Sequence, residues 1–273
     1  MADGQKRSQA KAEAKARGES TFAFSDGKIH AFETRNNYQK KTMRFIDWCR
    51  QEHGVRDLDH IRQRADELAS LYFTQRIAKG YSAWTLTTER SALRMFFGDR
   101  HLAERVEFPK RKREHIKRSR YPAARDKHFQ PDNWRPFINF CLASGLRREE
   151  LRDLYVRDIY YRPSDGQLVV HVCRGKGGKD RKVPVFPGRE QAVLGVVEGR
   201  AGDEKVFARL PDTDIHAWRR QFAQELYEYL SGRPLPPLEG RLQSPDLDRD
   251  AALKVSNCLG HGRIDIIFGS YIR

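Results

Sequence analysis

A strongly basic run divides the chain into two parts and limits how it can fold. Residues 110–120 read KRKREHIKRSR, with Pro109 before the run and Pro122 soon after it. Lysine and arginine are almost never fully buried without a partner, so the run is solvated and each side must build its own core. The sequence therefore predicts a basic linker, residues 106–128, between two domains. Its cationic residues are Lys110, Arg111, Lys112, Arg113, Lys117, Arg118 and Arg120.

The charge of the whole chain points to a polyanionic partner. Of its 273 residues, 52 are Lys or Arg and 37 are Asp or Glu, which leaves a formal net charge of +15. Nucleic acid is favoured over a membrane surface, because no basic amphipathic anchor is evident and the mean hydropathy is −0.79. The basic run then has two compatible interpretations, a solvated linker or a strap along a phosphate backbone.

The cysteines and the N-terminal residues bear on the compartment. The four cysteines (Cys49, Cys141, Cys173, Cys258) are scattered and form no Cys-x-x-Cys pair, which argues against a disulfide framework or a zinc ribbon. The first 20 residues lack the apolar stretch of a secretory signal. We expect a cytoplasmic, nucleoid-associated protein.

The part before the basic run has a helical pattern. Residues 1–21 are polar and predict a flexible basic tail, whereas residues 22–105 predict a helical domain. Its expected helices are residues 31–51, 58–79 and 82–97. Asp57 is the expected N-cap of the second helix, and Gly80 and Gly98 end the second and third.

The part after the basic run, residues 129–273, mixes helices with a small amount of strand. An amphipathic helix is expected to begin at Asp132 or Asn133 and to end at Gly145, before a short helix over 147–154. Residues 167–173 and 182–186 predict a β-hairpin with glycines at its tip. Residues 214–230 and 250–258 predict helices, the latter capped by Asp250, and the Pro-rich residues 231–250 predict a loop or insertion. The fold class is thus mainly α with a small β element, an α+β domain beside an all-α domain.

Four short segments of the second domain carry chemically capable residues. Arg147 lies in GLRREEL, Lys176 in RGKGGKDR, His216 and Arg219 in HAWRRQFA, and the last segment is LGHGRIDIIFGSYIR. Taken singly, each favours an ordinary role: a surface salt bridge, an exposed turn lysine or a packing tyrosine. Together they offer two arginines for non-bridging phosphate oxygens, a lysine as general acid and a tyrosine nucleophile. No paired carboxylates, Cys/His set or Walker loop is evident, so we expect phosphoryl transfer with neither metal nor cofactor.

In order and wording, these segments resemble the tyrosine recombinases, also called phage-type integrases, over residues 22–273. The resemblance implies that the N-terminal helices are a core-binding domain and that the two domains close as a C-shaped clamp around DNA. It implies a supporting acidic role for Glu150. The catalytic residues that it implies are Arg147, Lys176, His216, Arg219, His261 and the nucleophile Tyr271.

The resemblance implies site-specific recombination, in the service of a mobile element, through a 3′-phosphotyrosyl intermediate. Tyr271 would attack a phosphodiester while Lys176 protonates the 5′-oxygen. Arg147, Arg219 and His261 would hold the phosphate, and His216 would assist proton transfer. The implied partners are double-stranded DNA at a specific site, further copies of the chain in a tetramer on paired sites, and accessory DNA-bending or directionality proteins.

Some features depart from the family pattern and keep alternatives open. His261 and Tyr271 are ten residues apart rather than the common nine, residues 231–250 lengthen the interval before His261, and Arg220 stands where a histidine is frequent. The sequence stops at Arg273, so a C-terminal contact with a neighbouring subunit would be absent, differently made or removed by truncation. The main alternative is a non-catalytic DNA-binding relative that acts as regulator or partner subunit. A type IB topoisomerase, which shares the chemistry, ranks last.

Overall fold

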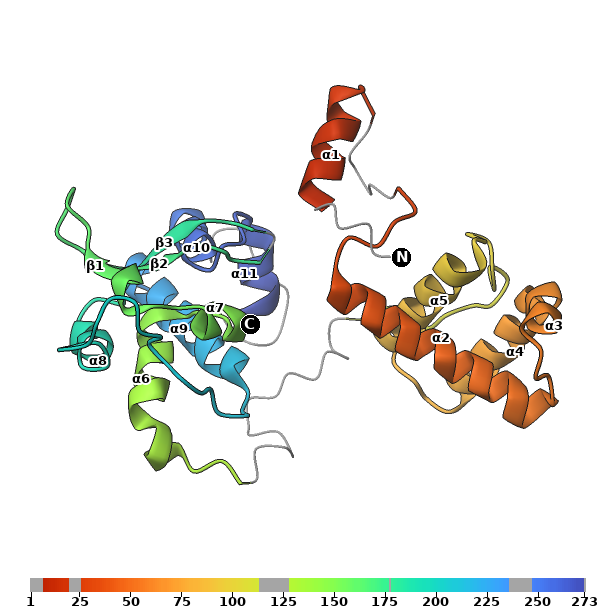
Figure 1. Cartoon of the computed structure of the whole chain (residues 1–273). Helices are drawn as coiled ribbons and strands as arrows, with labels where there is room; N and C mark the ends of the chain where they lie inside the picture. The colour runs from red at the N-terminus through yellow and green to blue at the C-terminus, as the bar shows by residue number, and fades with distance from the viewer. Residues whose placement is uncertain (1–6, 20–25, 113–127, 177, 236–246, 273) are drawn as a thin grey trace. The chain divides into compact units, whose positions relative to one another are not determined.

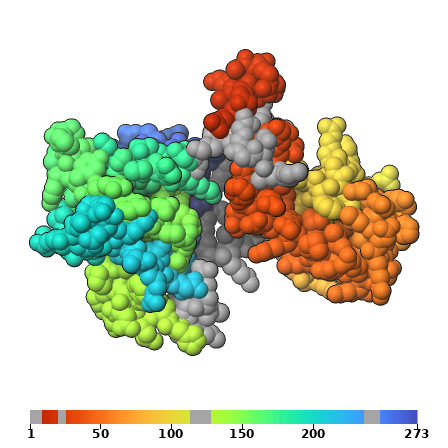
Figure 2. Space-filling model, in the orientation of Figure 1, coloured from red at the N-terminus to blue at the C-terminus, as the bar shows by residue number. Residues whose placement is uncertain are grey.

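The chain folds into two compact units, Met1–Lys117 and Arg118–Arg273 (Figure 1). The computed structural model describes residues 7–19, 26–112, 128–176, 178–235 and 247–272. The division between the units falls within the predicted linker, residues 106–128. Each unit has its own hydrophobic core, as expected for sequences separated by a highly charged segment. Figure 2 shows the surface of both units, coloured by position along the chain.

The described part of the first unit is helical. Its helices are α1 (Arg7–Ala16), α2 (Phe32–His53), α3 (Leu58–Gln63), α4 (Ala65–Ala78) and α5 (Ala83–Phe97). Helices α2, α4 and α5 pack on one another around buried Phe45, Phe73 and Leu86. Gly54 and Gly98 end α2 and α5 in the left-handed conformation, and Ser82 caps the start of α5. The all-α character predicted for this part is confirmed.

The helix predicted over residues 58–79 is instead two helices. Asp57 caps the start of α3 as predicted, through the backbone N–H groups of residues 59 and 60. The backbone leaves the helical conformation at Arg64 (φ −106°, ψ 21°), and α4 begins afresh at the next residue. The carboxylate of Asp66, in the first turn of α4, accepts a hydrogen bond from the Ala103 backbone N–H at 2.7 Å. This contact joins two residues that are 37 positions apart, so the pattern of apolar residues around Asp66 does not predict it.

Residues 7–16, within the stretch predicted to be a flexible tail, form helix α1. Its sequence, RSQAKAEAKA, is rich in alanine and lysine. Both residue types have high helix propensity, and Ala10 and Ala14, one turn apart, are buried, so a segment without large apolar residues still forms a helix.

The second unit combines helices with one sheet. Its elements are the 3-10 helix η3 (Pro131–Trp134), α6 (Arg135–Ser144), α7 (Arg148–Arg152), the 3-10 helix η4 (Val156–Asp158), β1 (Ile159–Tyr161), β2 (Leu168–Val172), β3 (Arg181–Pro184), α8 (Glu190–Leu194), α9 (Ile215–Ser231), α10 (Arg249–Cys258) and α11 (Ile264–Ser270). The predicted mainly helical α+β class is confirmed. Among the described residues, no helix combines the length and apolar character needed to cross a membrane.

The sheet is antiparallel with strand order β1-β2-β3. The predicted hairpin is confirmed as β2 and β3, with Val170 opposite Val183. On the other side of β2, Ile159 of β1 lies opposite Val170. Strand β1 was not predicted from the sequence, because three residues are too few to establish an alternating pattern.

Two predicted helix caps in this unit are wrong. Asp132 and Asn133 lie inside η3, and α6 begins after Trp134, whose side chain makes no cap hydrogen bond. Helix α10 is capped by Asp248, which accepts from the Ala251 backbone N–H at 2.9 Å, so Asp250 lies within the first turn. In both places several polar residues in succession satisfy the same local capping pattern.

The packing of α6 against α9 positions the candidate site. Gly145 ends α6 with φ +59°, and a Cβ there would lie 2.2 Å from the Phe222 ring of α9. Only glycine combines that conformation with so close an approach. Helix α9 also packs on α10, and α10 contacts both β3 and α11 (Figure 1). These contacts hold α6, α9, α10 and α11 next to one another in the second unit.

Candidate active site

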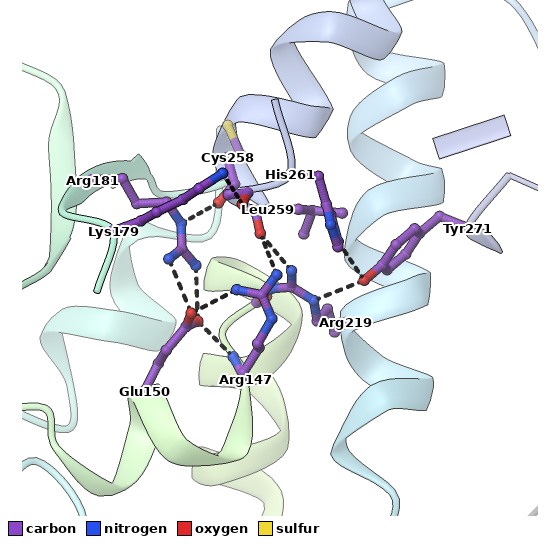
Figure 3. Close-up of polar contacts among 11 residues, drawn as sticks. Arg147, Glu150, Lys179, Arg181, Arg219, Cys258, Leu259, His261 and Tyr271 are labelled. Carbon is purple, nitrogen blue, oxygen red and sulfur yellow. Dashed lines mark hydrogen bonds and ion pairs between the residues drawn. The ribbon is translucent and has the colours of Figure 1, made fainter. Parts of the chain in front are cut away.

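Two arginines, a histidine and a tyrosine from distant parts of the second unit converge on one place (Figure 3). Arg147 is the N-cap of α7, and Arg219 lies in α9. His261 follows α10, and Tyr271 is the C-cap of α11. The carbonyl oxygen of Leu259 accepts from both guanidinium groups, at 2.9 Å from Arg147 Nη2 and 2.7 Å from Arg219 Nη2. One backbone oxygen thus holds two cationic side chains beside each other.

Glu150 orients the first of these arginines. Its carboxylate accepts from the Arg147 backbone N–H at 2.9 Å and from Arg147 Nη1 at 2.7 Å. It also accepts from both terminal nitrogens of Arg181, at 3.0 and 2.8 Å. Burial alone would raise the pKa of Glu150, but the hydrogen bonds from Arg181 and Arg147 and their charges lower it to about 2. The carboxylate is therefore ionised at neutral pH and ties two arginines together.

Arg219 is completely buried, with a relative exposure of 0%. Its guanidinium donates to the carbonyl oxygens of Gly145 and Leu259 and, at 3.2 Å from Nε, to the hydroxyl of Tyr271. Burial lowers the pKa of Arg219 to about 10, opposed by its interaction with Tyr271, so the side chain remains charged at neutral pH.

The hydroxyl of Tyr271 lies between Arg219 and His261. His261 Nε2 is 3.0 Å from that oxygen, within hydrogen-bond distance. Burial, followed by the charges of Arg219 and Arg147, lowers the pKa of His261 to about 4. The imidazole is therefore neutral near pH 7 and has a nitrogen able to accept a proton.

The position of Tyr271 is fixed by the residues around it. Its carbonyl oxygen accepts from Gln224 Nε2 at 2.9 Å, and its backbone N–H donates to the Ile267 oxygen at 3.0 Å. The next residue, Ile272, is buried in the core that α9, α10 and α11 share. The ten-residue interval after His261 therefore still brings the tyrosine hydroxyl to the arginine and the histidine of its own chain.

A known domain family matches part of the first unit. Residues 27–99 match the phage integrase N-terminal SAM-like domain. This part of the chain is therefore similar in sequence to that domain. The SAM-like domain covers α2 to α5. No curated protein sequence matches the chain significantly.

Solved structures extend the likeness to the whole chain at the level of the fold. The Tn1549 transposon integrase in complex with circular intermediate DNA aligns over 98% of this chain and 95% of that chain, with 15% identity and a TM-score of 0.52. Its complex with transposon right end DNA aligns over 97% and 95%, with 16% identity and a TM-score of 0.50. The XerH site-specific recombinase bound to difH substrate aligns over 87% and 75%, with 16% identity and a TM-score of 0.47. The resemblance to phage-type integrases, predicted from the sequence, is confirmed for the fold.

Two predicted site residues of this integrase fold lie outside the hydrogen-bonded cluster. His216 is in the first turn of α9, one turn before Arg219, with its side chain exposed at the surface. Partial burial and the charge of Arg219 lower its pKa. Lys176 is exposed on the turn between β2 and β3, which a hydrogen bond from the Gly178 N–H to the Gly175 oxygen closes at 2.7 Å.

Two residues of the same hairpin contact the cluster, although they were not among the predicted site residues. Arg181 Nε donates to the Cys258 oxygen at 2.9 Å and so connects β3 to the end of α10, while its terminal nitrogens connect β3 to Glu150 of α7. Lys179 Nζ lies 3.4 Å from the oxygen of Gly260, next to His261. Both belong to the segment RGKGGKDR that was singled out for Lys176, so the sequence signal for this segment included them.

The basic run is only partly within the described residues. Lys110, Arg111 and Lys112 are exposed, and the Arg111 guanidinium lies 5.8 Å from the centroid of the Trp84 ring in α5. Arg113, Lys117, Arg118 and Arg120 lie outside the described residues.

Proposed function

We propose that the protein is a site-specific DNA recombinase that cuts and rejoins strands through a 3′-phosphotyrosyl intermediate, in the service of a mobile element. The observation that carries this proposal is the tyrosine hydroxyl held between a buried arginine and a neutral histidine. Tyr271 contacts Arg219 and His261 directly, and Arg147 shares the Leu259 oxygen with Arg219. A tyrosine nucleophile, two forked cations and a proton acceptor are the groups that an attack on a phosphodiester needs.

Arg147 and Arg219 bind the scissile phosphate in this mechanism. Each guanidinium has N–H groups in a planar fork that suits two non-bridging oxygens, and both are anchored on backbone oxygens. Without DNA, the Tyr271 hydroxyl covers the Nε of Arg219. The phosphate takes over that contact, which turns the phenol from a hydrogen-bond partner of the arginine into a nucleophile beside the phosphorus.

His261 receives the phenolic proton. Burial, followed by the cations around it, keeps its pKa at about 4 in the free protein, which makes it a weak base. A phosphodiester bound between Arg147 and Arg219 brings a negative charge, and a nearby opposite charge favours the protonated imidazole. DNA binding therefore raises the pKa of His261 and prepares the base at the moment when it is needed. This role differs from the prediction that assigned proton transfer to His216.

The departing 5′-oxygen requires a proton donor, and the hairpin between β2 and β3 supplies it. Lys176 is exposed at the tip and reaches the leaving group when the hairpin meets DNA. Lys179 stays at the Gly260 oxygen and holds the hairpin against the turn that carries His261. The partner strand's 5′-hydroxyl then reverses the attack, so the phosphoester bond energy is conserved. Neither ATP nor a catalytic metal takes part in these steps.

The proposed substrate is double-stranded DNA at a specific site, and strand exchange requires a tetramer of the chain on two paired sites. The net charge of +15 supports the DNA partner. The solved complexes of the Tn1549 integrase contain DNA, which supports the same class of substrate. Accessory DNA-bending or directionality proteins belong to this proposal as partners during assembly.

A nicked substrate that releases its short 3′-flank tests the proposal. The DNA is chosen by selecting the genomic fragments that the full chain binds most tightly. We expect a covalent protein–DNA adduct that withstands denaturant and disappears in Tyr271→Phe. Tyr229→Phe, an exposed tyrosine of α9, is the matched control and retains the adduct.

The non-catalytic alternative gives a different result in the same experiment. A regulator or partner subunit binds the selected DNA specifically but forms no adduct, with or without Tyr271. A type IB topoisomerase forms adducts without a defined site and relaxes supercoiled plasmids of any sequence. Adduct formation by Tyr271→Phe would contradict the role of this tyrosine.

A further inference from the structure

Three side chains with different metal-binding atoms lie together where β2 leads into the β2–β3 turn. They are Asp158, His171 and Cys173, whose donor atoms all lie within 4.8 Å of one another. His171 and Cys173 are two positions apart along β2 and its extension, so their side chains are on the same face. Because Ile159 pairs with Val170, the antiparallel register brings Asp158, one residue earlier, opposite His171.

The distances among these atoms match those between ligands of one cation. Cys173 Sγ lies 3.7 Å from His171 Nδ1 and 3.8 Å from Asp158 Oδ1. In a tetrahedral zinc site, with bonds of about 2.3 Å to sulfur and about 2.0 Å to nitrogen or oxygen, sulfur is about 3.5 Å from the other ligands. Both distances from the sulfur are within a few tenths of an ångström of this value, and the third pair of donor atoms also lies within 4.8 Å.

Other groups hold the remaining atoms of two of these side chains. His171 Nε2 lies 2.8 Å from a carboxylate oxygen of Asp180, and Asp158 Oδ2 accepts from the Tyr155 backbone N–H at 2.9 Å. These contacts leave His171 Nδ1 and Asp158 Oδ1 directed at Cys173. A carboxylate on the far nitrogen of a ligating histidine is a recurrent feature of metal sites, since it fixes the ring and its tautomer.

The three side chains also line an accessible pocket of about 430 Å³. Of the four free cysteines, Cys173 is the exposed one, so its sulfur can be reached by an ion. Two cations that line the pocket are engaged with the Tyr155 ring, Arg157 at 4.6 Å and Lys205 at 4.0 Å from its centroid. Figure 2 shows the sheet region of this unit, in green and blue-green, at the molecular surface.

We propose that the end of β2, beside the β2–β3 turn, binds one zinc-class divalent cation through Cys173 Sγ, His171 Nδ1 and Asp158 Oδ1, with water as the fourth ligand. Binding forms three metal–protein bonds and releases the thiol proton to solvent. The ion connects the start of β1 to the end of β2, and so fixes the base of the arm that carries Lys176. The proposal is independent of strand cleavage. No metal site was predicted from the sequence, because the ligands form no contiguous motif.

Cobalt binding to the full, metal-stripped chain tests the site. Co²⁺, added with a reductant that has no thiol, is expected to bind one ion per chain and to produce the near-ultraviolet absorption of a cobalt–thiolate bond. Zn²⁺ should displace it and abolish the absorption. The band should vanish in Cys173→Ser and persist in Cys258→Ser, a matched control at a half-buried cysteine. Asp180→Asn, an exposed change beside the site, should weaken Co²⁺ binding by at least about tenfold.

The readout separates this site from adventitious binding. Absence of the charge-transfer band at saturating Co²⁺ overturns the proposal, as does a band that persists in Cys173→Ser. Binding that requires two chains per ion, measured by sedimentation, also overturns it. Circular dichroism verifies that each variant is folded. Asp158→Asn, which keeps both thiol and imidazole, is expected to weaken binding while preserving the band at higher Co²⁺.

Discussion

Glu150 carries much of the organisation of the arginine cluster. Its side chain joins Arg147 to Arg181 and has a relative exposure of only 2%. Replacing it with glutamine leaves two largely buried cations, with side-chain exposures of 14% and 9%, without their counter-charge, and we expect Glu150→Gln to lower the free energy of unfolding by about 3 kcal/mol. Urea denaturation measures the change. Glu149→Gln, at an exposed neighbour paired with Arg152, is the control and should change it by less than about 0.5 kcal/mol.

The titration of His261 allows a second prediction at this scale. With a folded pKa of about 4 and an unfolded pKa near 6.5, the unfolded chain binds a proton that the folded chain refuses. The neutral imidazole therefore contributes stability above pH 6.5, and this contribution disappears as the pH falls toward 4. NMR titration should place the His261 midpoint near 4, with the resonance assigned by its absence in His261→Gln. Bound DNA should raise the midpoint, and an unchanged midpoint would contradict the proposed activation.

At the scale of elements, the junction of α6 and α9 depends on one glycine. Gly145 has both a positive φ and the Phe222 ring against its Cα, whereas Gly98, with φ +69°, has no atom within 4 Å of an added Cβ. Gly145→Ala should therefore lower the free energy of unfolding by more than about 2 kcal/mol, and Gly98→Ala by only about 1 kcal/mol. Thermal or urea unfolding compares the two variants. Equal losses of stability would mean that the ring moves away without cost.

The elements also show what the sequence could predict. Helices with a clear apolar stripe or a terminal glycine, such as α2, α5 and α9, were predicted close to their observed bounds. The break at Arg64 was missed because no glycine or proline marks it, and strand β1 was missed because it has only three residues. In the candidate site, the motifs led to Arg147, Arg219, His261 and Tyr271, which the fold brings together. Arg181 lies in the segment singled out for Lys176, but its contacts with Glu150 and the Cys258 oxygen depend on the tertiary fold, so the segment alone did not assign its role.

At the scale of the whole molecule, the basic run should contribute to DNA binding without contributing sequence preference. Replacing residues 110–113 by alanine removes four cations. We expect weaker binding by a similar factor on all DNA sequences. The slope of log affinity against log salt should decrease by about 0.9 for each phosphate that the variant no longer neutralises. Fluorescence anisotropy at several salt concentrations measures it. An unchanged slope would make the run a solvated linker only.

The central claim for the whole molecule is that Tyr271 forms a covalent bond with DNA. The most direct measurement digests the adduct trapped on a nicked substrate and locates the modified residue by mass spectrometry. We predict a phosphotyrosyl bond at Tyr271, attached to the 3′ side of the cut, with a free 5′-hydroxyl on the other fragment. A modification on any other residue, attachment to the 5′ phosphate, or no adduct on DNA that the protein binds specifically would contradict it.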